Sequence, residues 1–115
     1  ARFVQLIATG QLVSEQVSVE LEHWLSINAD LSMIAGALGV DPIAHADGMA
    51  GTRLFNKTGT DAGVRADIGY FETKTANVSY AVLANWTPGE VADSAVMHAI
   101  AKIGSDILRS ASSSG

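Results

Sequence analysis

The chain has 115 residues, 48% of them hydrophobic, which is the composition of one packed globular unit and argues against a disordered chain. Its formal net charge of −5 provides no broad basic field, so nucleic acid and anionic membranes are not expected as partners. The sequence has no cysteine for a disulfide framework or a thiolate metal site, and no apolar run reaches the roughly 18 residues of a membrane span.

A short helix is predicted at the start of the chain, in the segment ARFVQLIATG. Its apolar face consists of Phe3, Leu6 and Ile7, and Gly10 is a suitable terminal residue. No capping residue and no initiator Met precede it, so we expect the chain to begin inside an element. We expect it to be either a piece of a longer protein or the later portion of one whose earlier portion is a separate chain.

A second helix is predicted to start at Ser14, a good N-cap residue, with Glu15 favourable in the first turn. We expect one stripe of this helix to pack on a neighbouring element. The stripe consists of Val17, Leu21, Trp24, Leu25 and Asn28.

The periodicity then weakens, and one short helical turn is predicted from about Leu31 to Leu38. The residues that follow indicate a connection into a sheet, because glycine and proline interrupt the pattern. These residues are Gly39, Pro42, Gly48 and Gly51.

Three strands are predicted at residues 52–59, 65–72 and 77–85. Because the connections between them are short, neighbouring strands are expected to pair antiparallel. Both faces of the third strand are fairly apolar, so both faces of the sheet are expected to be covered.

A long C-terminal helix is predicted from the segment TPGE, which has a threonine suited to the N-cap, a proline at the first helical position and a glutamate at the third. The helix is expected to run from about Pro88 to about Ser110 and to be followed by a polar tail. Its predicted apolar stripe consists of Val91, Ala95, Ala99, Ile103 and Ile107.

The predicted organisation therefore has helices and a connection in residues 1–51, three antiparallel strands in 52–85, the C-terminal helix in 87–110 and a tail in 111–115. The fold class is α/β of the α+β type, with an antiparallel sheet flanked by helices.

Candidate chemistry lies on the first strand. Lys57 offers a compact positive charge, Thr58 offers a hydroxyl, and Gly59 lets a ligand approach the backbone. Together they suit a carboxylate, and the backbone N–H of Thr60 suits an oxyanion. The alternative is an ordinary solvated strand end, which the tripeptide taken alone favours.

Other site types have weak support. The histidines His23, His45 and His98 lack the spacing of metal ligands, so no metal site is predicted, and no cofactor is predicted either. Trp24 and Trp86 are predicted to be packing residues rather than platforms for a ligand.

The run NKTGTDAGVRADIGYF, then VSYAVLANW and a C-terminal helix, resembles the last third of a class A β-lactamase or a close relative among the serine penicillin-recognising enzymes. K-T-G is one of the signature motifs of that family. Upstream, FVQLIATGQLVSEQVSVELEHWLSIN and SMIAGAL resemble the two helices that precede the K-T-G strand, including the placement of Trp24. The resemblance covers nearly the whole chain and implies a partial β-lactamase/transpeptidase-like fold.

The resemblance implies a role for each residue of the motif. Lys57 would hold the substrate carboxylate and support proton movement near the nucleophile. Thr58 would bind the same carboxylate beside Gly59, and Thr60 would supply the oxyanion-hole amide.

Two more residues are implied to line the substrate cleft. Asp61 would sit at the strand end, and Arg65 would be a second cation pointing at the carboxylate. The turn before Arg65 is about one residue shorter than in common members of the family. Arg65 is therefore either that second cation or a surface arginine near Asp67.

The nucleophile of the family is missing from this sequence, which contains no S-x-x-K, no S-D-N and no recognisable water-positioning glutamate. The resemblance implies that an N-terminal segment of the same protein supplies them as the partner of this chain. It also implies a secreted, periplasmic or cell-envelope location in a bacterium.

Three functions remain open. One is a β-lactamase-like serine hydrolase that forms an acyl-enzyme with a β-lactam. Another is a penicillin-binding D,D-peptidase or esterase that acts on a D-Ala-D-Ala-type peptide, and the last is a non-catalytic binding relative.

Overall fold

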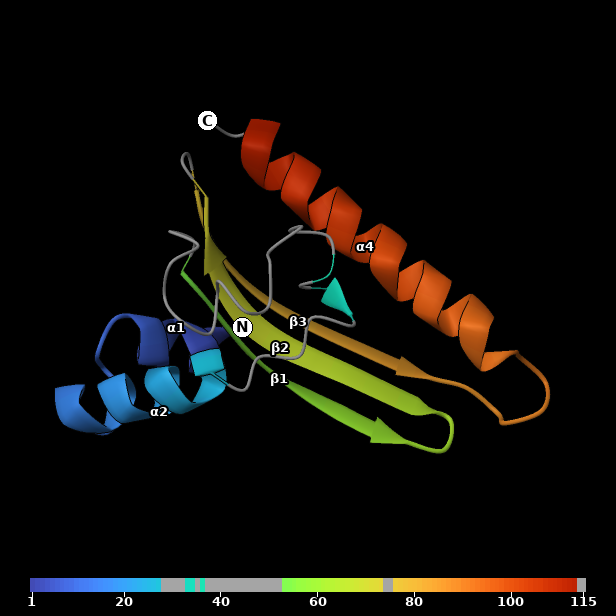
Figure 1. Cartoon of the computed structure of the whole chain (residues 1–115), viewed down its shortest axis with the longest axis horizontal. Coiled ribbons are helices and arrows are strands. Elements are labelled where there is room, and N and C mark those ends of the chain that lie inside the picture. Colours follow the sequence, from blue (N-terminus) through green and yellow to red (C-terminus); the bar gives the residue numbers. More distant parts are fainter. Residues whose placement is uncertain (28–32, 35, 37–52, 74–75, 114–115) are drawn as a thin grey trace.

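The computed structural model of the protein describes residues 1–27, 33–34, 36, 53–73 and 76–113. In chain order the elements are α1 (Arg2–Ala8), α2 (Glu15–Ile27), β1 (Leu54–Asp61), β2 (Val64–Glu72), β3 (Asn77–Asn85) and α4 (Asp93–Ser113). The three strands form one antiparallel sheet in the order β1-β2-β3, with α4 along it and α1 and α2 on the other side (Figure 1). This confirms the predicted α+β fold class.

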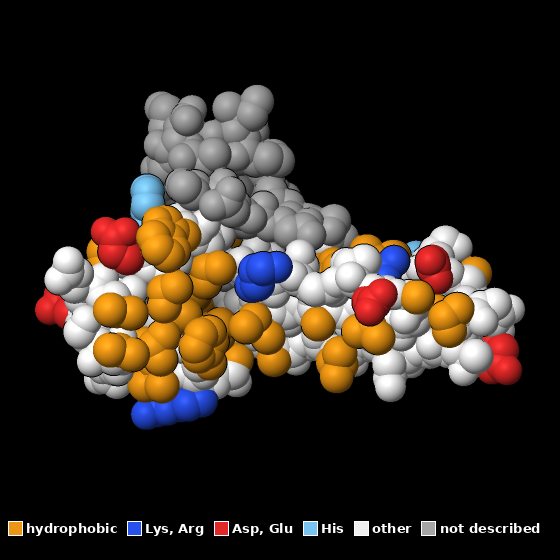
Figure 2. All heavy atoms as spheres, turned by 90° about the horizontal axis from the view of Figure 1, so that it is seen from below, with side chains coloured by type: hydrophobic (Ala, Val, Ile, Leu, Met, Phe, Trp, Pro, Cys, Tyr) orange, Lys and Arg blue, Asp and Glu red, His pale blue; other side chains and the backbone are white. Residues whose placement is uncertain are grey.

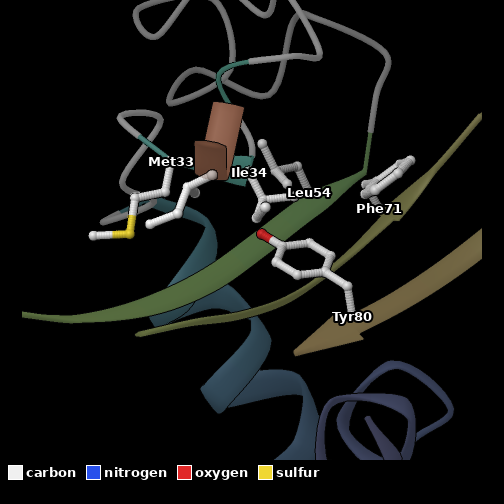
Figure 3. Packing of buried hydrophobic residues seen from close by; sticks show 6 residues of the cluster. Met33, Ile34, Leu54, Phe71 and Tyr80 are labelled. Carbon is white, nitrogen blue, oxygen red and sulfur yellow. The ribbon is translucent and has the colours of Figure 1, made fainter. Parts of the chain in front are cut away.

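Each face of the sheet has its own hydrophobic core, because side chains of successive strand residues point to opposite faces. On the α4 face, Leu54, Phe71 and Tyr80 lie in one cluster (Figure 3). Ile100 of α4 belongs to the same cluster. On the other face, Phe55 and Tyr70 stack with their ring centroids 5.5 Å apart and pack on α1. Both faces of the sheet therefore carry a core, but the prediction that both are covered was only partly correct, because Ala81 and Leu83 of β3 are exposed on the face away from α4.

Helix α4 begins later than predicted, because the segment TPGE forms a turn rather than the first turn of a helix. The backbone N–H of Glu90 donates to the carbonyl of Thr87 at 3.1 Å, and Gly89 has a φ of +90°. Proline at the second position and glycine with positive φ at the third are typical of a type II turn. The predicted start at Pro88 was wrong, and the helix instead runs from Asp93 to Ser113.

The predicted apolar stripe of α4 was also wrong in most of its positions. Ile103 and Val91 are 41% and 44% exposed, whereas Ile107 does pack against the core. A step of four residues turns about 400° in an α-helix, so a stripe built only on such steps drifts around the helix. The residues that pack on the sheet follow the true period and are Val96, Met97, Ile100, Ile107 and Leu108.

The N-terminal helices agree with the sequence at their caps. The Oγ atom of Ser14 accepts a hydrogen bond of 3.1 Å from the backbone N–H of Val17, which confirms the predicted N-cap of α2. Gly10 has a φ of 75° just beyond α1, where a left-handed residue ends the helix.

The predicted apolar faces of these helices were only partly correct. Phe3 is 51% exposed, and Val4 lies buried beside Ile7 in its place. On α2, Leu21 and Leu25 pack against the core, but Trp24 is 57% exposed, so its prediction as a packing residue was wrong. Among the described residues, the buried side of α2 is therefore narrower than the predicted stripe.

Part of the predicted helical turn from Leu31 to Leu38 lies outside the described residues, as do Asn28 and the glycine- and proline-rich connection. Within the turn, Met33 and Ile34 are buried in the core on the α4 face. None of the helices in the described ranges has both the length and the apolar character needed to cross a bilayer.

Arg53, just before β1, joins four segments of the chain. Its guanidinium donates to Glu22 at 2.5 and 2.6 Å, to Glu72 at 2.8 Å and to the carbonyl of Ala8 at 2.8 Å. It also lies 5.2 Å from the centroid of the Tyr70 ring. The hydrogen bond from Arg53 holds the pKa of Glu72 below its ordinary value, and the one to Glu22 raises the pKa of Arg53. The start of β1 is thereby fixed to α1, α2 and β2.

We predict that Arg53→Ala lowers the free energy of unfolding by about 1–2 kcal/mol, because it leaves half-buried acceptors without their donor. Urea unfolding measures this change. Lys102→Ala on α4 is the control, because the Lys102–Asp106 pair is exposed and its loss should cost less than about 0.5 kcal/mol. Equal effects of the two substitutions would contradict the role of Arg53.

The ion pair of Arg53 with Glu72 predicts a pH dependence of stability. Because the pKa of Glu72 is depressed in the folded protein, its contribution to stability is complete above the unfolded pKa and is lost as pH falls below 4.5. The parent protein should therefore lose more stability than Arg53→Ala over this range, as measured by urea unfolding at several pH values. Parallel curves for the two proteins would show that the pair does not act in this way.

Candidate active site

The K-T-G residues lie on β1, which is an outer strand of the sheet that the structure describes (Figure 1). β2 pairs with only one side of β1, and no strand among the described residues pairs with the other side. An unpaired strand edge offers backbone N–H and C=O groups to an extended ligand. The motif is therefore placed where a peptide-like molecule can approach its backbone.

Strand β1 passes from the core to the surface at the motif. Leu54, Phe55 and Asn56 are buried, whereas Lys57 is exposed and Thr58 is half-buried. The next residues, Gly59, Thr60 and Asp61, are exposed. The buried first half of the strand thus anchors an exposed second half.

The side chains of Lys57 and Thr58 point to opposite faces of the sheet, because strand residues alternate. The Nζ atom of Lys57 donates a hydrogen bond to the backbone carbonyl of Thr58. A ligand that contacts both side chains has to lie along the edge of β1 rather than on either face. The long, flexible stem of lysine suits such an approach.

Arg65 is the partner of Thr60 in the pairing of β1 with β2. Its guanidinium donates to the carbonyls of Asp61 at 2.9 Å and Val64 at 2.8 Å, and lies 3.9 Å from the carboxylate of Asp93. The Arg65 side chain is 17% exposed, so it is not a freely solvated surface cation. These contacts direct it towards the hairpin and the start of α4.

The hairpin after the motif docks on the segment that leads into α4. Gly63 has a φ of 69°, and its carbonyl accepts a 2.9 Å hydrogen bond from the backbone N–H of Trp86. A Cβ atom on Gly63 would lie 2.4 Å from the carbonyl oxygen of Trp86 and 3.1 Å from Pro88. Asp61 completes the turn, because its Oδ1 accepts from the N–H of Ala62 at 2.7 Å. The end of β1 is therefore held by close backbone contacts.

Trp86 is half-buried, as expected of a packing residue, and the guanidinium of Arg65 lies 5.5 Å from its ring. Within the part of the chain that the structure describes, its Nε1 atom is buried without a hydrogen-bond partner. The ring is thus held by packing and by the arginine above it.

Sequence reasoning missed a buried polar group behind the motif. Asp67 is 1% exposed and is the partner of Thr58 across the pair of strands. It accepts hydrogen bonds from the side chains of Asn56 and Tyr80. The signal in the sequence was an aspartate between Ala66 and Ile68 in the middle of a predicted strand, because such a residue needs partners when it is buried.

No metal centre was found where the structure describes the chain, since its acidic and histidine side chains form no group of three suited to an ion. His23 and His98 are exposed, and His45 lies outside the described residues. A hollow of about 610 Å³ between the start of β3 and the last turns of α4 is lined by Val78, Ile103 and Ile107, among others. Its lining includes none of the K-T-G residues.

The chain is similar to known proteins in sequence and in fold. Residues 1–111 match the model of the beta-lactamase enzyme family, and the chain therefore belongs to that family. The fold is similar to the crystal structure of a beta-lactamase from Sphaerobacter thermophilus DSM 20745, with a TM-score of 0.75 and 22% sequence identity. The match covers 95% of this chain and 37% of that one, so this chain spans well under half the length of that relative. No curated protein matches the sequence.

The hairpin contacts generate a stability prediction. Gly63→Ala should cost about 3 kcal/mol, because it adds a clash with the Trp86 carbonyl to the strain of a positive φ. Gly89→Ala is the matched control: it has a φ of +90° but no atom near the added Cβ, and it should cost about 1 kcal/mol. Thermal unfolding of both variants measures the difference, and equal losses would exclude the clash as its cause.

Proposed function

We propose that this chain is the part of a β-lactamase-like serine hydrolase that binds the substrate carboxylate and the developing oxyanion during hydrolysis of a β-lactam. The observation that carries the proposal is the K-T-G motif on the exposed second half of an edge strand, in a chain of the beta-lactamase enzyme family. A β-lactam is a small, peptide-like molecule, and a strand edge suits its amide and carboxylate groups.

Each residue of the motif has a chemical role in this proposal. Lys57 attracts the carboxylate and supports proton movement near the nucleophile, and the hydroxyl of Thr58 donates to the same carboxylate. Gly59 leaves the backbone open, and the N–H of Thr60 stabilises the oxyanion. The exposure of Lys57 and the half-exposed position of Thr58 support these roles.

Asp61 and Arg65 complete the proposed site at the hairpin end of β1. Asp61 is exposed next to Thr60, and its carboxylate shapes the turn. Arg65 lies opposite Thr60 in the strand pair, and this position supports its proposed role as a second cation near the carboxylate, with Asp93 as its present neighbour. Its contacts with the hairpin carbonyls limit how far it can move.

The proposed partner is an N-terminal segment of the same protein that carries S-x-x-K. In the reaction, the serine oxygen adds to the lactam carbonyl, the C–N bond breaks and the ring nitrogen takes a proton. Water activated by a glutamate then cleaves the acyl ester and restores the serine. Family membership also supports export to the bacterial cell envelope, where such substrates are met.

Exposed apolar side chains support the existence of such a segment. Figure 2 shows hydrophobic side chains gathered over the end of the molecule that α1 and α2 form. The large exposed hydrophobic residues of these helices and of the loop between them are Phe3, Val13, Val17, Val19 and Trp24. On the other elements, Leu83 is 71% exposed. Surfaces of this kind in a folded protein mark contacts with another segment or chain.

Intact-mass measurement of the complete protein after brief exposure to a penicillin tests the function. We expect the polypeptide that carries S-x-x-K to gain the mass of the drug, and the adduct to disappear as water cleaves the ester. A lasting adduct would instead support the penicillin-binding D,D-peptidase or esterase. Binding with no adduct would favour the non-catalytic relative, and would contradict the hydrolase.

Replacing Lys57 tests the proposed carboxylate clamp, which consists of Lys57 and Thr58. In the complete protein, Lys57→Ala should lower kcat/KM for a penicillin by about tenfold to a hundredfold, because a charge-assisted contact with the carboxylate is lost. The methyl ester of the same penicillin should be affected much less, and the exposed position of Lys57 predicts little change in thermal stability. Steady-state kinetics on both substrates, with Lys102→Ala as the control, provide the measurement.

The penicillin and its methyl ester also test the role of Arg65. A raised KM for the penicillin but not for its ester in Arg65→Ala would support the second-cation role. Equal effects on both substrates would mean that Arg65 serves the hairpin alone. If Lys57→Ala itself left both rates unchanged, the carboxylate clamp would be rejected.

A further inference from the structure

A buried acid lies directly behind the K-T-G motif. Asp67, in the middle of β2, is 1% exposed, and a carboxylate in such a place needs hydrogen bonds to offset its loss of water. Its Oδ2 atom accepts from the backbone N–H of Ile34 at 3.1 Å. Its Oδ1 atom accepts from Asn56 Nδ2 at 3.3 Å and from the hydroxyl of Tyr80 at 3.2 Å. One carboxylate therefore joins β1, β3 and the backbone of Ile34.

A glycine makes this network possible. Gly69 is the pairing partner of Asn56 on β1 and of Tyr80 on β3. A Cβ atom on Gly69 would lie 2.5 Å from the Tyr80 hydroxyl and 2.8 Å from Cβ of Asn56. The phenol of Tyr80 therefore lies over β2 in the space that Gly69 leaves free. Its hydroxyl is directed towards Ile34 and Leu54 (Figure 3).

The network ends at the point where β1 leaves the core. Asn56 is the last buried residue of β1 and immediately precedes Lys57, while Asp67 is the pairing partner of Thr58. Asn56, Thr58 and Asp67 share one face of the sheet, because residues alternate along each strand and pair across it. Beyond Thr58 the strand is exposed, so the last core contacts of β1 govern how the motif is presented.

We propose that Asp67 is a positioning residue for the motif: with Asn56 and Tyr80 it holds β1 so that Thr58 and Lys57 meet the substrate carboxylate together. This inference rests on the proposed function, because it concerns the same carboxylate site. Asp67 touches no substrate and acts through its neighbours on β1.

The alternative is that the network only stabilises the core. A purely structural role would lower the activity of a variant towards all substrates alike, in proportion to the fraction unfolded. A positioning role changes the discrimination between a penicillin and its methyl ester, because only the free carboxylate uses the clamp. The ratio of kcat/KM for these two substrates therefore separates the two roles.

The experiment measures this ratio in the complete protein for Asp67→Asn, Tyr80→Phe and Tyr70→Phe, well below each melting temperature. Asp67→Asn keeps the shape but replaces an acceptor oxygen by a donor, and Tyr80→Phe removes only the hydroxyl that reaches Asp67. Tyr70→Phe is the matched control, because Tyr70 is similarly buried in the same sheet but its hydroxyl donates to Glu72 at 3.0 Å. We expect the ratio to fall by about tenfold in the first two variants and to stay unchanged in the control.

Each outcome decides the matter. If Asp67→Asn fails to fold, the milder Tyr80→Phe gives the answer. An unchanged ratio in Tyr80→Phe, or an equal fall in Tyr70→Phe, would overturn the positioning role while leaving the proposed function in place, provided that Lys57→Ala lowers the ratio. An unchanged ratio in Lys57→Ala would show that the proposed function itself had failed.

Discussion

The pairing register of β1 with β2 is the constraint on which the rest of the structure depends. It sets Leu54 opposite Phe71 and Phe55 opposite Tyr70, so each pair falls in a different core. A slip of one residue would turn every side chain of β1 to the other face. The two cores and the short hairpin therefore specify one register, and that register also places Thr58 opposite Asp67.

Strand β1 is held firmly at both ends and is open between them. At its start, Arg53 binds acceptors from α1, α2 and β2. At its end, the hairpin around Gly63 packs on the backbone of Trp86. The motif lies between these anchors on an edge with no partner strand among the described residues. A binding site gains from this arrangement, because preorganised groups lose less freedom when a ligand binds.

The chain belongs to the beta-lactamase enzyme family, and its fold is similar to part of a longer protein. Its match to the beta-lactamase from Sphaerobacter thermophilus covers 37% of that protein, and several large apolar side chains stay exposed on the described surface. Both observations fit a clamp that works together with a segment supplying the nucleophile. In the proposed function, the site is half of a catalytic centre: it would provide charge and hydrogen-bond donors, and the other half would carry out the bond making.

The sequence by itself determined the strands, the antiparallel pairing, the Ser14 cap and the K-T-G motif, because each depends on local periodicity or on a few adjacent residues. Local rules misassigned the start of α4, because the pair Pro88-Gly89 satisfies both a helix cap and a type II turn. They also misplaced Trp24, whose exposure depends on how widely α2 contacts its neighbours.

Only the tertiary structure decided the partners of Arg53, Arg65 and Asp67. Their contacts join segments that are brought together by the folding of the sheet and helices, and no periodicity along the chain encodes a meeting of that kind.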